Sequence, residues 1–353
     1  MKKVFCYSLF LLSLVVLTHS CIDEITLDID NDQRFVIVEG LVTDVAGLYA
    51  VSVNNSPVIG VGNDNIFEPI EGCQVSLIDN TGRAISFIES TEDRGTYERN
   101  LVGLDLDKTY HIEVILPDGD VIESIPQPLP SAFVPIDFVE WDVIDVEFIN
   151  ESGNVATRPF VEIYVNSLPI ENDGFVRWRV TGEFDIIERA FGLLNPRHCY
   201  VSQAIDVNDI LIANTEEFVE GRIVREPVSR LPIDSRFNIL YLFNVSQFSM
   251  NEEEYIYWTN IEKLVNVDGT LFDPPPGIIS GNLRNVTDPS KIVQGYFSVS
   301  RLSFFRRFVN IAERGYFADT DCLTRPNANN PAKCLDCTTL PNSTLVRPPY
   351  WLI

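Results

Sequence analysis

The residues whose type and spacing could do chemistry lie closest together near the C-terminus, at Cys322, Cys334 and Cys337. Cysteines in such spacings either form disulfides or bind a structural metal. The surrounding segment is rich in proline and asparagine and offers little core, so one disulfide there would pin a loop. The alternative is a metal site completed by His198 or Cys199, although such sites normally use two close ligand pairs. We expect a disulfide among the three cysteines, no metal, and at least one unpaired thiol.

No catalytic constellation is evident. Beyond the N-terminal leader the histidines are His111, in an alternating strand pattern, and His198, and no Gly-x-Ser-x-Gly motif accompanies them. Acids such as Asp185, Glu188 and Glu254 could pair as in glycosidases, but 51 acidic residues produce many such pairs by chance. There is no phosphate-binding glycine loop or nucleotide fingerprint. We therefore assign no catalytic residue and no cofactor, and expect a protein that is not an enzyme. A surface hydrolase is the weakest alternative.

The N-terminus has the pattern of a secretory signal that ends in a lipidation site. Lys2 and Lys3 precede a short apolar run over residues 4–17, and Ser20 stands directly before Cys21. The apolar run is short for a membrane span. We expect residues 1–20 to be removed and Cys21 to carry acyl chains such as palmitate, which would anchor the protein to a membrane. The alternative is an ordinary signal-peptidase site with Cys21 as a structural thiol.

Acidity is the main feature of the composition. The formal net charge is −25, which excludes nucleic acid as a partner because its binding requires clusters of Lys and Arg. Residues 21–33 form an acidic tether that resembles the export signals of surface lipoproteins in Bacteroidota, or is simply a solvated linker. Asp28, Asp30 and Asp32 alternate as in a calcium loop, but the required Gly and Glu are missing, so we expect no calcium there.

The elements that would position any site are mostly short strands. Residues 34–130 contain seven alternating segments separated by turn residues, at 35–42, 48–53, 74–78, 84–89, 95–100, 110–116 and 120–125. Such spacing is typical of a β-sandwich. The proline-rich stretch 125–130 is the expected domain boundary. Alternation resumes at 137–148, 160–167, 175–187, 237–245 and 294–301. The sequence predicts a mainly β protein, with an Ig-like sandwich at 34–130 and a second β-rich domain with one or two short helices at 131–353.

One amphipathic helix is expected between residues 245 and 265. Ser249 or Asn251 could cap its N-terminus, and Tyr255 and Trp258 lie on its apolar face. The aromatic residues Tyr255, Trp258 and Trp351 are the best candidates for ligand binding, because sugars and peptides dock on exposed rings. The alternative, which the periodicity favours, is that these rings fill the core. The apolar chain end that includes Trp351 is expected to pack on the second domain or contact a partner.

Two resemblances follow from these motifs. The segments Val38-Glu39-Gly40, Gly72-Cys73-Gln74-Val75, Gly95-Thr96-Tyr97 and Thr109-Tyr110-His111 resemble the transthyretin-like (carboxypeptidase regulatory-like) module, a sandwich without catalytic residues. The chain as a whole resembles a Bacteroidota lipoprotein family named domain of unknown function 4249. The segments that carry this second resemblance are Glu254-Tyr255-Ile256-Tyr257-Trp258, Phe272-Asp273-Pro274-Pro275-Pro276, Gly281-Asn282-Leu283-Arg284-Asn285, Gln294-Gly295-Tyr296-Phe297-Ser298 and Cys334-Leu335-Asp336-Cys337.

The family resemblance implies an address and a kind of partner. Its members resemble surface lipoproteins often encoded near TonB-dependent receptors, and no catalytic residues are assigned to them. We therefore expect a lipid-anchored outer-membrane protein facing the cell surface, a non-catalytic accessory subunit of a TonB-dependent receptor with an unknown cargo. A structural or adhesion component of an envelope assembly is the alternative.

Overall fold

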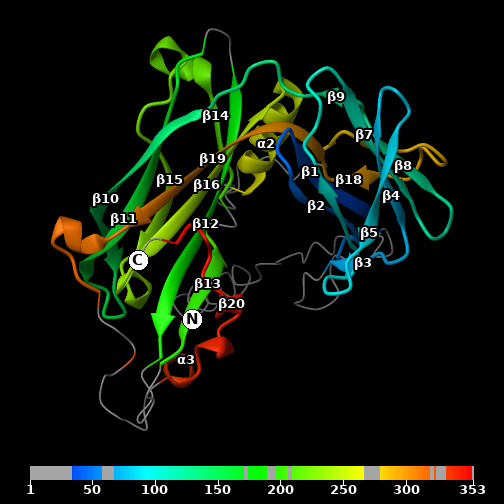
Figure 1. Cartoon of the computed structure of the whole chain (residues 1–353). Coiled ribbons are helices and arrows are strands. Elements are labelled where there is room, and N and C mark those ends of the chain that lie inside the picture. Colours follow the sequence, from blue (N-terminus) through cyan, green and yellow to red (C-terminus); the bar gives the residue numbers. More distant parts are fainter. Residues whose placement is uncertain are drawn as a thin grey trace, which may run out of the picture.

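A computed structural model describes residues 34–57, 67–170, 174–188, 196–205, 209–265, 279–318, 322 and 331–351. The expected signal, the acidic tether with Cys21, and the proline segment 273–277 lie outside the described residues. Within them the chain is mainly β, as the sequence predicts, and forms two sandwich-like units side by side (Figure 1).

The first unit, the N-terminal module, has two facing layers. One layer places β2 (Gly47–Asn55) between β1 (Val36–Thr43) and β6 (Thr96–Leu101). The other layer joins β4 (Gln74–Asp79), β5 (Ala84–Glu89), β7 (Thr109–Ile115) and β8 (Val121–Ser124), and the short strands β3 (Glu68–Pro69) and β9 (Gln127–Pro128) lie at the margins. Alternate residues of both layers form its core, including Val38, Val51, Leu77, Ile112 and Val114.

The second unit, the C-terminal module, also has two layers. The larger sheet contains β12 (Phe175–Ile187), β13 (His198–Ala204), β14 (Leu211–Asn214), β16 (Tyr241–Met250), β20 (Ser343–Thr344) and the second part of β19 (Phe297–Val309). The smaller sheet contains β10 (Ile136–Ile149), β11 (Val155–Ser167) and β15 (Glu226–Pro232). Trp141, Ile163, Trp178 and Phe243 are buried between the two layers.

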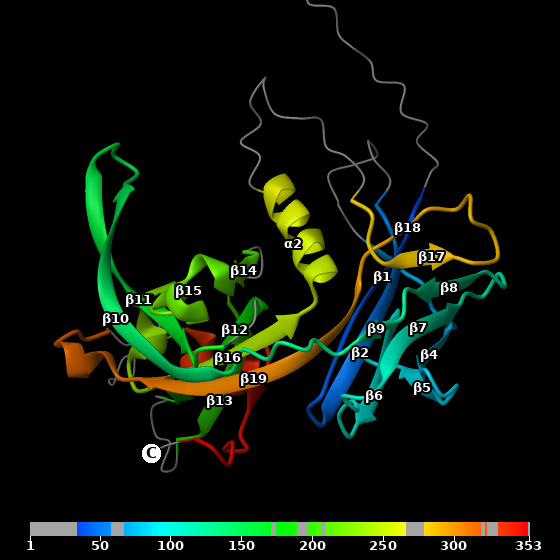
Figure 2. The ribbon, with the colours of Figure 1, turned by 90° about the horizontal axis from the view of Figure 1, so that it is seen from above.

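Helices are few and short among the described residues. The longer one, α2 (Glu252–Val265), follows β16 and lies between the two modules (Figure 2). The other is α3 (Ala332–Leu335), and single 3-10 turns occur at Thr215–Glu217, Val219–Gly221, Ser235–Phe237, Ile311–Arg314 and Cys337–Thr339. The expectation that Ser249 could cap α2 is wrong, because Ser249 belongs to β16 and its hydroxyl accepts a hydrogen bond from the Val134 amide.

The two modules share one strand. Phe297–Ser300 of β19 pair in parallel with Gly40–Thr43 of β1, and the rest of β19 pairs antiparallel with β16. Two further strands, β17 (Leu283–Asn285) and β18 (Val293–Gln294), pair with β8 and β1. Residues 283–300 therefore add strands to the N-terminal module although they follow residue 130 in the chain.

Asn282 stabilises the entry into this shared strand. Its amide donates to the Phe297 carbonyl at 2.8 Å, and its carbonyl oxygen accepts from the Phe297 amide at 2.9 Å. Asn282 is buried, so water cannot satisfy the Phe297 backbone there. The Asn282 side chain therefore makes the two hydrogen bonds that a neighbouring strand would otherwise provide. Gly295, two residues before Phe297, has a φ of +96°, and a Cβ there would lie 2.1 Å from the Val38 carbonyl oxygen. Only glycine fits that position.

Replacing Asn282 by Ala should lower the free energy of unfolding by about 2 kcal/mol or more, because a buried amide and carbonyl lose their partner. Urea denaturation of the mature chain measures this change. Asn100→Ala is the matched control, since Asn100 is exposed and should change stability by less than about 0.5 kcal/mol. Equal effects of the two substitutions would contradict the role assigned to Asn282.

Disulfides fasten the C-terminal tail. Cys322 pairs with Cys334 across 12 residues, whereas Cys337 pairs with Cys199 across 138 residues. The sequence had suggested Cys199 only as an alternative metal ligand. Cys73 is a free, buried thiol in the N-terminal module. The Cys199–Cys337 bond holds the tail against β13, where Ser343 and Thr344 add the short strand β20.

The two disulfides should differ in their contribution to stability. In the chain-entropy model the longer loop constrains the unfolded chain more, so Cys199→Ser with Cys337→Ser should lower stability by about 2 kcal/mol more than Cys322→Ser with Cys334→Ser. Urea unfolding of the two double variants makes the comparison, and each serves as the control for the other. A larger loss from the short-range pair would show that native packing outweighs loop closure.

Candidate binding cleft

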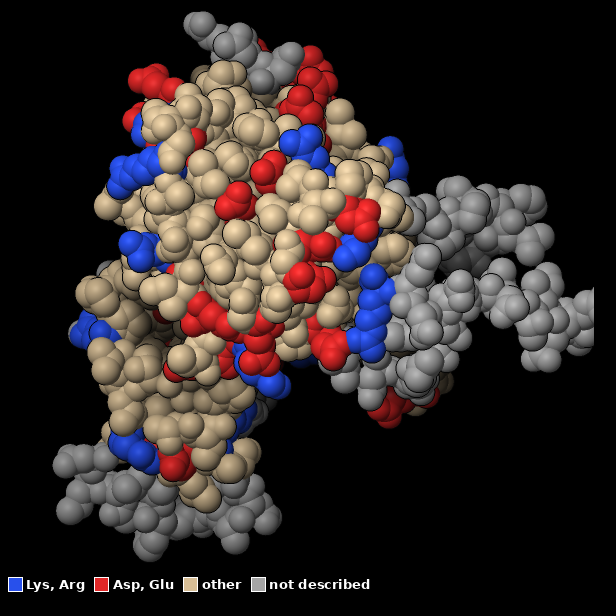
Figure 3. All heavy atoms as spheres, turned by 90° about the vertical axis from the view of Figure 1, so that its right-hand side faces the viewer, with Lys and Arg blue, Asp and Glu red and all other residues tan. Residues whose placement is uncertain are grey.

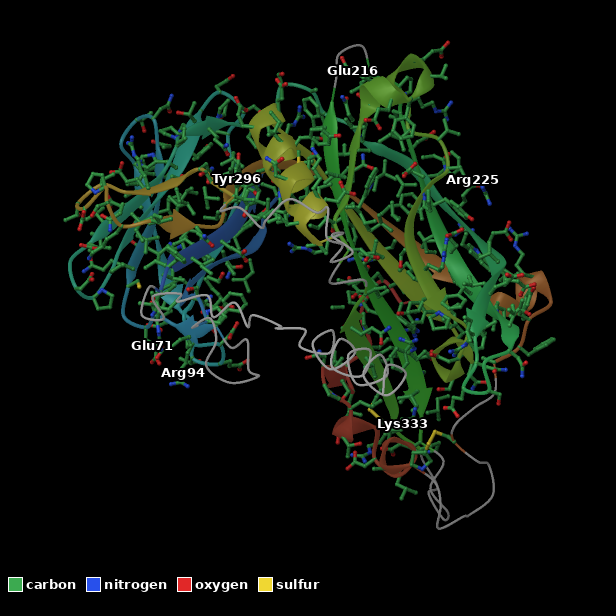
Figure 4. The ribbon with its side chains drawn as sticks, turned by 180° about the vertical axis from the view of Figure 1, so that it is seen from behind. Glu71, Arg94, Glu216, Arg225, Tyr296 and Lys333 are labelled. Carbon is green, nitrogen blue, oxygen red and sulfur yellow. A yellow bond between two sulfur atoms is a disulfide. The ribbon has the colours of Figure 1, made fainter. Side chains whose placement is uncertain are left out.

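A cleft of about 450 Å³ lies where the two modules meet, and we call it the junction cleft. Strands β1 and β2 form one wall, β12 and β16 form another, and α2 and β19 complete it. The lining residues are Glu39, Gly40, Leu41, Thr43, Leu48, Tyr49, Ala50, Ser52, Thr96, Arg177, Arg179, Phe248, Tyr257, Trp258, Tyr296, Ser298 and Leu302. Tyr296 lies close to α2 at this junction (Figure 4). Side chains from both modules are therefore needed to form the cleft.

Helix α2 presents aromatic rings to the cleft. The Tyr257 ring packs on Tyr296 with centroids 4.8 Å apart and meets Trp258 edge to face at 5.3 Å. Two residues before Tyr257, Tyr255 stacks on Phe175 at 4.8 Å and so fastens the helix to β12. Acidic residues fill the first turn of α2, which suits the positive end of the helix dipole. These contacts fix the rings in place.

Two arginines of β12 line the cleft next to these rings. Arg177 and Arg179 lie two residues apart on β12, so they project from the same face of the sheet. The Arg177 guanidinium lies 4.1 Å from the centroid of Trp258, and Arg179 lies 5.8 Å from that of Phe248. Neither arginine forms an ion pair with another described residue. Burial lowers the pKa of Arg177, opposed by the charge of Glu254.

Glu254 lies behind the cleft and is fully buried. Its carboxylate accepts hydrogen bonds from the Ser298 hydroxyl at 2.7 Å, the Trp258 indole at 3.3 Å and the Ser300 hydroxyl at 3.4 Å. Burial raises the pKa of Glu254 despite the opposing charge of Arg177. Burial also raises the pKa of Tyr257 to about 12, so this ring keeps its hydroxyl proton. Glu254 thus ties α2 to the shared strand β19 and orients Trp258.

The aromatic candidates from the sequence occupy different places. Trp258 lines the cleft, whereas Tyr255 packs against Phe175. Trp351 is 4% exposed and lies against Tyr200 and Phe308 on the C-terminal module, at centroid distances of 5.2 and 5.6 Å. The structure does not bring Trp351 near the junction cleft. The residues that sequence reasoning missed are Arg177 and Arg179, whose signal was the alternation Arg-Trp-Arg in a predicted strand.

One histidine–carboxylate pair lies elsewhere, at the far end of β12. His198 Nε2 lies 2.7 Å from an Asp185 oxygen, and its ring stacks on Tyr200 at 4.8 Å. Burial raises the pKa of Asp185, against the lowering effect of His198. Within the described part of the chain no hydroxyl or thiol is hydrogen-bonded to His198. The pair therefore resembles the His–Asp part of a catalytic triad, and no described nucleophile is hydrogen-bonded to the histidine.

The described residues contain no group of three or more His, Cys, Asp and Glu side chains arranged as metal ligands. No helix in the same residues is both long and apolar enough to cross a bilayer.

Charged side chains of both signs are spread over the outer face of the N-terminal module (Figure 3).

Fold and site together define a class: a two-module β protein whose modules share a strand and enclose a cleft of aromatic and arginine side chains. The chain belongs to the family described as Domain of unknown function (DUF4249), whose model matches residues 22–303. This confirms the family expected from the sequence. A search of curated proteins gave no match. Several of the segments that suggested the family, including Tyr257-Trp258, Gly281-Asn282 and Tyr296-Phe297, meet at the junction.

Replacing Glu254 by Gln should stabilise the protein by an amount that grows as the pH rises above about 4.5. The pKa of Glu254 is raised above its ordinary value of 4.5, so the folded state favours the protonated carboxyl. That contribution is present below the unfolded pKa and is lost as pH rises through the folded pKa. The Gln side chain does not titrate, so its contribution to stability does not change with pH. Its amide oxygen can still accept the hydrogen bond from the Ser298 hydroxyl.

Urea unfolding of both proteins across this pH range gives the difference. Glu253→Gln is the matched control, because Glu253 is the exposed neighbour on the same helix and its substitution should leave the difference from the parent nearly constant. A constant difference for Glu254→Gln would show that burial leaves the protonation of this carboxyl unchanged on folding.

Proposed function

We propose that the protein is a lipid-anchored, surface-exposed outer-membrane protein of a Bacteroidota cell, which binds a ligand in the junction cleft as a non-catalytic accessory subunit of a TonB-dependent receptor. The observation that carries the binding role is the cleft, whose rings and arginines come from both modules. The leader that ends at Cys21 and the acidic segment after it support the anchor and the address. In this proposal the N-terminal module is a transthyretin-like spacer next to the tether.

The groups in the cleft favour binding over catalysis. Its titratable lining residues are Glu39, two arginines and three tyrosines, and Glu254 behind it holds α2 through neutral donors. A hydrolase needs a nucleophile and a base, or two carboxyl groups across a scissile bond. Neither arrangement occurs among the described lining residues. Rings and guanidinium groups that are already held in place suit reversible binding instead.

A projecting hairpin supports a protein partner. Strands β10 and β11 pair from Ile136 to Ile149, and their far end extends beyond the module as a curved arm (Figure 2). Phe148, Ile149 and Val155 near its tip are 44%, 75% and 70% exposed. Exposed apolar residues on a projecting element are a common feature of protein interaction surfaces. In the proposed assembly this arm contacts the receptor.

A tagged protein should co-purify with a TonB-dependent receptor in stoichiometric amount when native outer membranes are dissolved in mild detergent. Mass spectrometry identifies the chains, and protease treatment of intact cells should cleave the protein if it faces outward. Cys21→Ser is the control, because loss of the acyl chains should release the protein from the membrane fraction.

The outcomes separate the alternatives. Recovery of envelope-assembly proteins in place of a receptor would favour a structural or adhesion role. Recovery of the protein alone would contradict the accessory role, and resistance to protease on intact cells would contradict the outward orientation.

A further inference from the structure

Two cavities share three lining residues, Arg177, Arg179 and Trp258. These residues line the junction cleft of about 450 Å³ and also an adjoining cavity of about 250 Å³. Ile205 and Leu211 also line the second cavity. A ligand in either cavity would therefore lie next to both arginines.

Neither guanidinium group is hydrogen-bonded to a carboxylate of the described residues, although the charges of Glu254 and Glu39 act on Arg177 without an ion-pair contact. The chain carries a formal net charge of −25, and arginines elsewhere, such as Arg225, Arg230 and Arg236, form ion pairs. No hydrogen bond or ion pair joins the guanidinium of Arg177 or Arg179 to another described residue. Two adjacent arginines whose donors no carboxylate occupies are a suitable site for an anion supplied from outside.

The packing of Arg177 leaves its hydrogen-bonding edge available. Its planar group lies over the Trp258 ring at 4.1 Å, so one face is covered by the ring. A guanidinium donates hydrogen bonds in its own plane, which suits the two oxygens of a carboxylate. Glu254, which fixes Trp258 through the indole N–H, also holds this stacking partner in place.

The rest of the junction cleft combines apolar side chains and rings with the hydroxyl groups of Thr43, Ser52, Thr96 and Ser298. Leu41, Leu48 and Leu302 line it together with Tyr257 and Tyr296. Among its described lining residues Glu39 is the one carboxylate and no Asn or Gln occurs. Neutral sugars are normally recognised through several amide and carboxylate side chains, so this lining fits an apolar body better than a polyhydroxylated one.

We infer that the junction cleft binds a molecule that carries a carboxylate on an apolar body, with Arg177 and Arg179 as the residues that bind the carboxylate. A peptide that ends in an aromatic residue and a small aromatic acid share this chemistry. The inference rests on the binding role proposed above, and it is independent of the receptor and of the membrane address.

Calorimetric titration of the full mature chain, with Cys21→Ser to keep it free of acyl chains, tests the inference. The probes are acetyl-Ala-Ala-Phe, the same peptide with a C-terminal amide, and 3-phenylpropionate. The free acid should bind roughly tenfold or more tightly than the amide, because charge-assisted hydrogen bonds to the carboxylate are lost. Arg179→Gln should weaken binding of the acid by a similar factor and leave binding of the amide almost unchanged.

Matched variants keep the test independent of folding. Arg179 is exposed, so Arg179→Gln should preserve the circular dichroism spectrum and unfolding midpoint even if Arg177→Gln does not. Arg83→Gln is the control, because Arg83 is an exposed arginine of the N-terminal module outside both cavities, and its substitution should not alter affinity.

Three results would overturn the inference: no measurable binding of either acid, equal binding of acid and amide, or unchanged affinity in Arg179→Gln. If 3-phenylpropionate binds as tightly as the peptide, the ligand class is small aromatic acids, and if only the peptide binds, it is peptide ends. Co-purification with a receptor is measured separately, so failure of the ligand inference and failure of the accessory role remain distinguishable.

Discussion

The structure depends on one shared strand. β19 belongs to the N-terminal module through its first residues and to the C-terminal module through the rest, and both pairings are backbone ladders. Two domains joined by a linker can move relative to each other by default. Here such a motion would have to bend β19 or break hydrogen bonds in one of its two ladders. The walls of the junction cleft are therefore held by the main chain, and a ligand would meet a largely preformed site.

The buried polar groups at the junction lower the stability of the fold below what apolar side chains in their place would give. A buried carboxylate such as Glu254 loses its hydration, and its neutral donors replace only part of it. Well-packed apolar residues would often stabilise the same position as well or better. A second unfavourable feature, the partly buried Arg177 on Trp258, lies on the cleft side of the same network. Polar groups retained at such positions are concentrated at functional sites, which is consistent with a binding role for this cleft.

Much of the fold could be predicted from the sequence because it rests on local patterns. Alternation located β1, β4, β7 and β12, and the change to helical periodicity located α2. The short strands β13 and β15 were not predicted. β15 contains Pro227 and Pro232, which a central strand would exclude, but β15 lies at the edge of its sheet and tolerates them. The return of residues 283–300 to the N-terminal module depends on contacts between distant segments, and so does the pairing of Cys199 with Cys337.

The site was harder to predict because a binding role for its arginines depends on which ion pairs the fold leaves unformed. Arg177 and Arg179 are ordinary strand residues until the fold shows that no carboxylate pairs with them in a chain of net charge −25. Physiological salt screens charges beyond about 8 Å, so the overall acidity hardly opposes an anion that has reached the cleft. It does repel that anion at longer range, and the rate of association gains no steering from the protein's field. Affinity must therefore arise from contacts within the cleft, where rings and guanidinium groups are already in place.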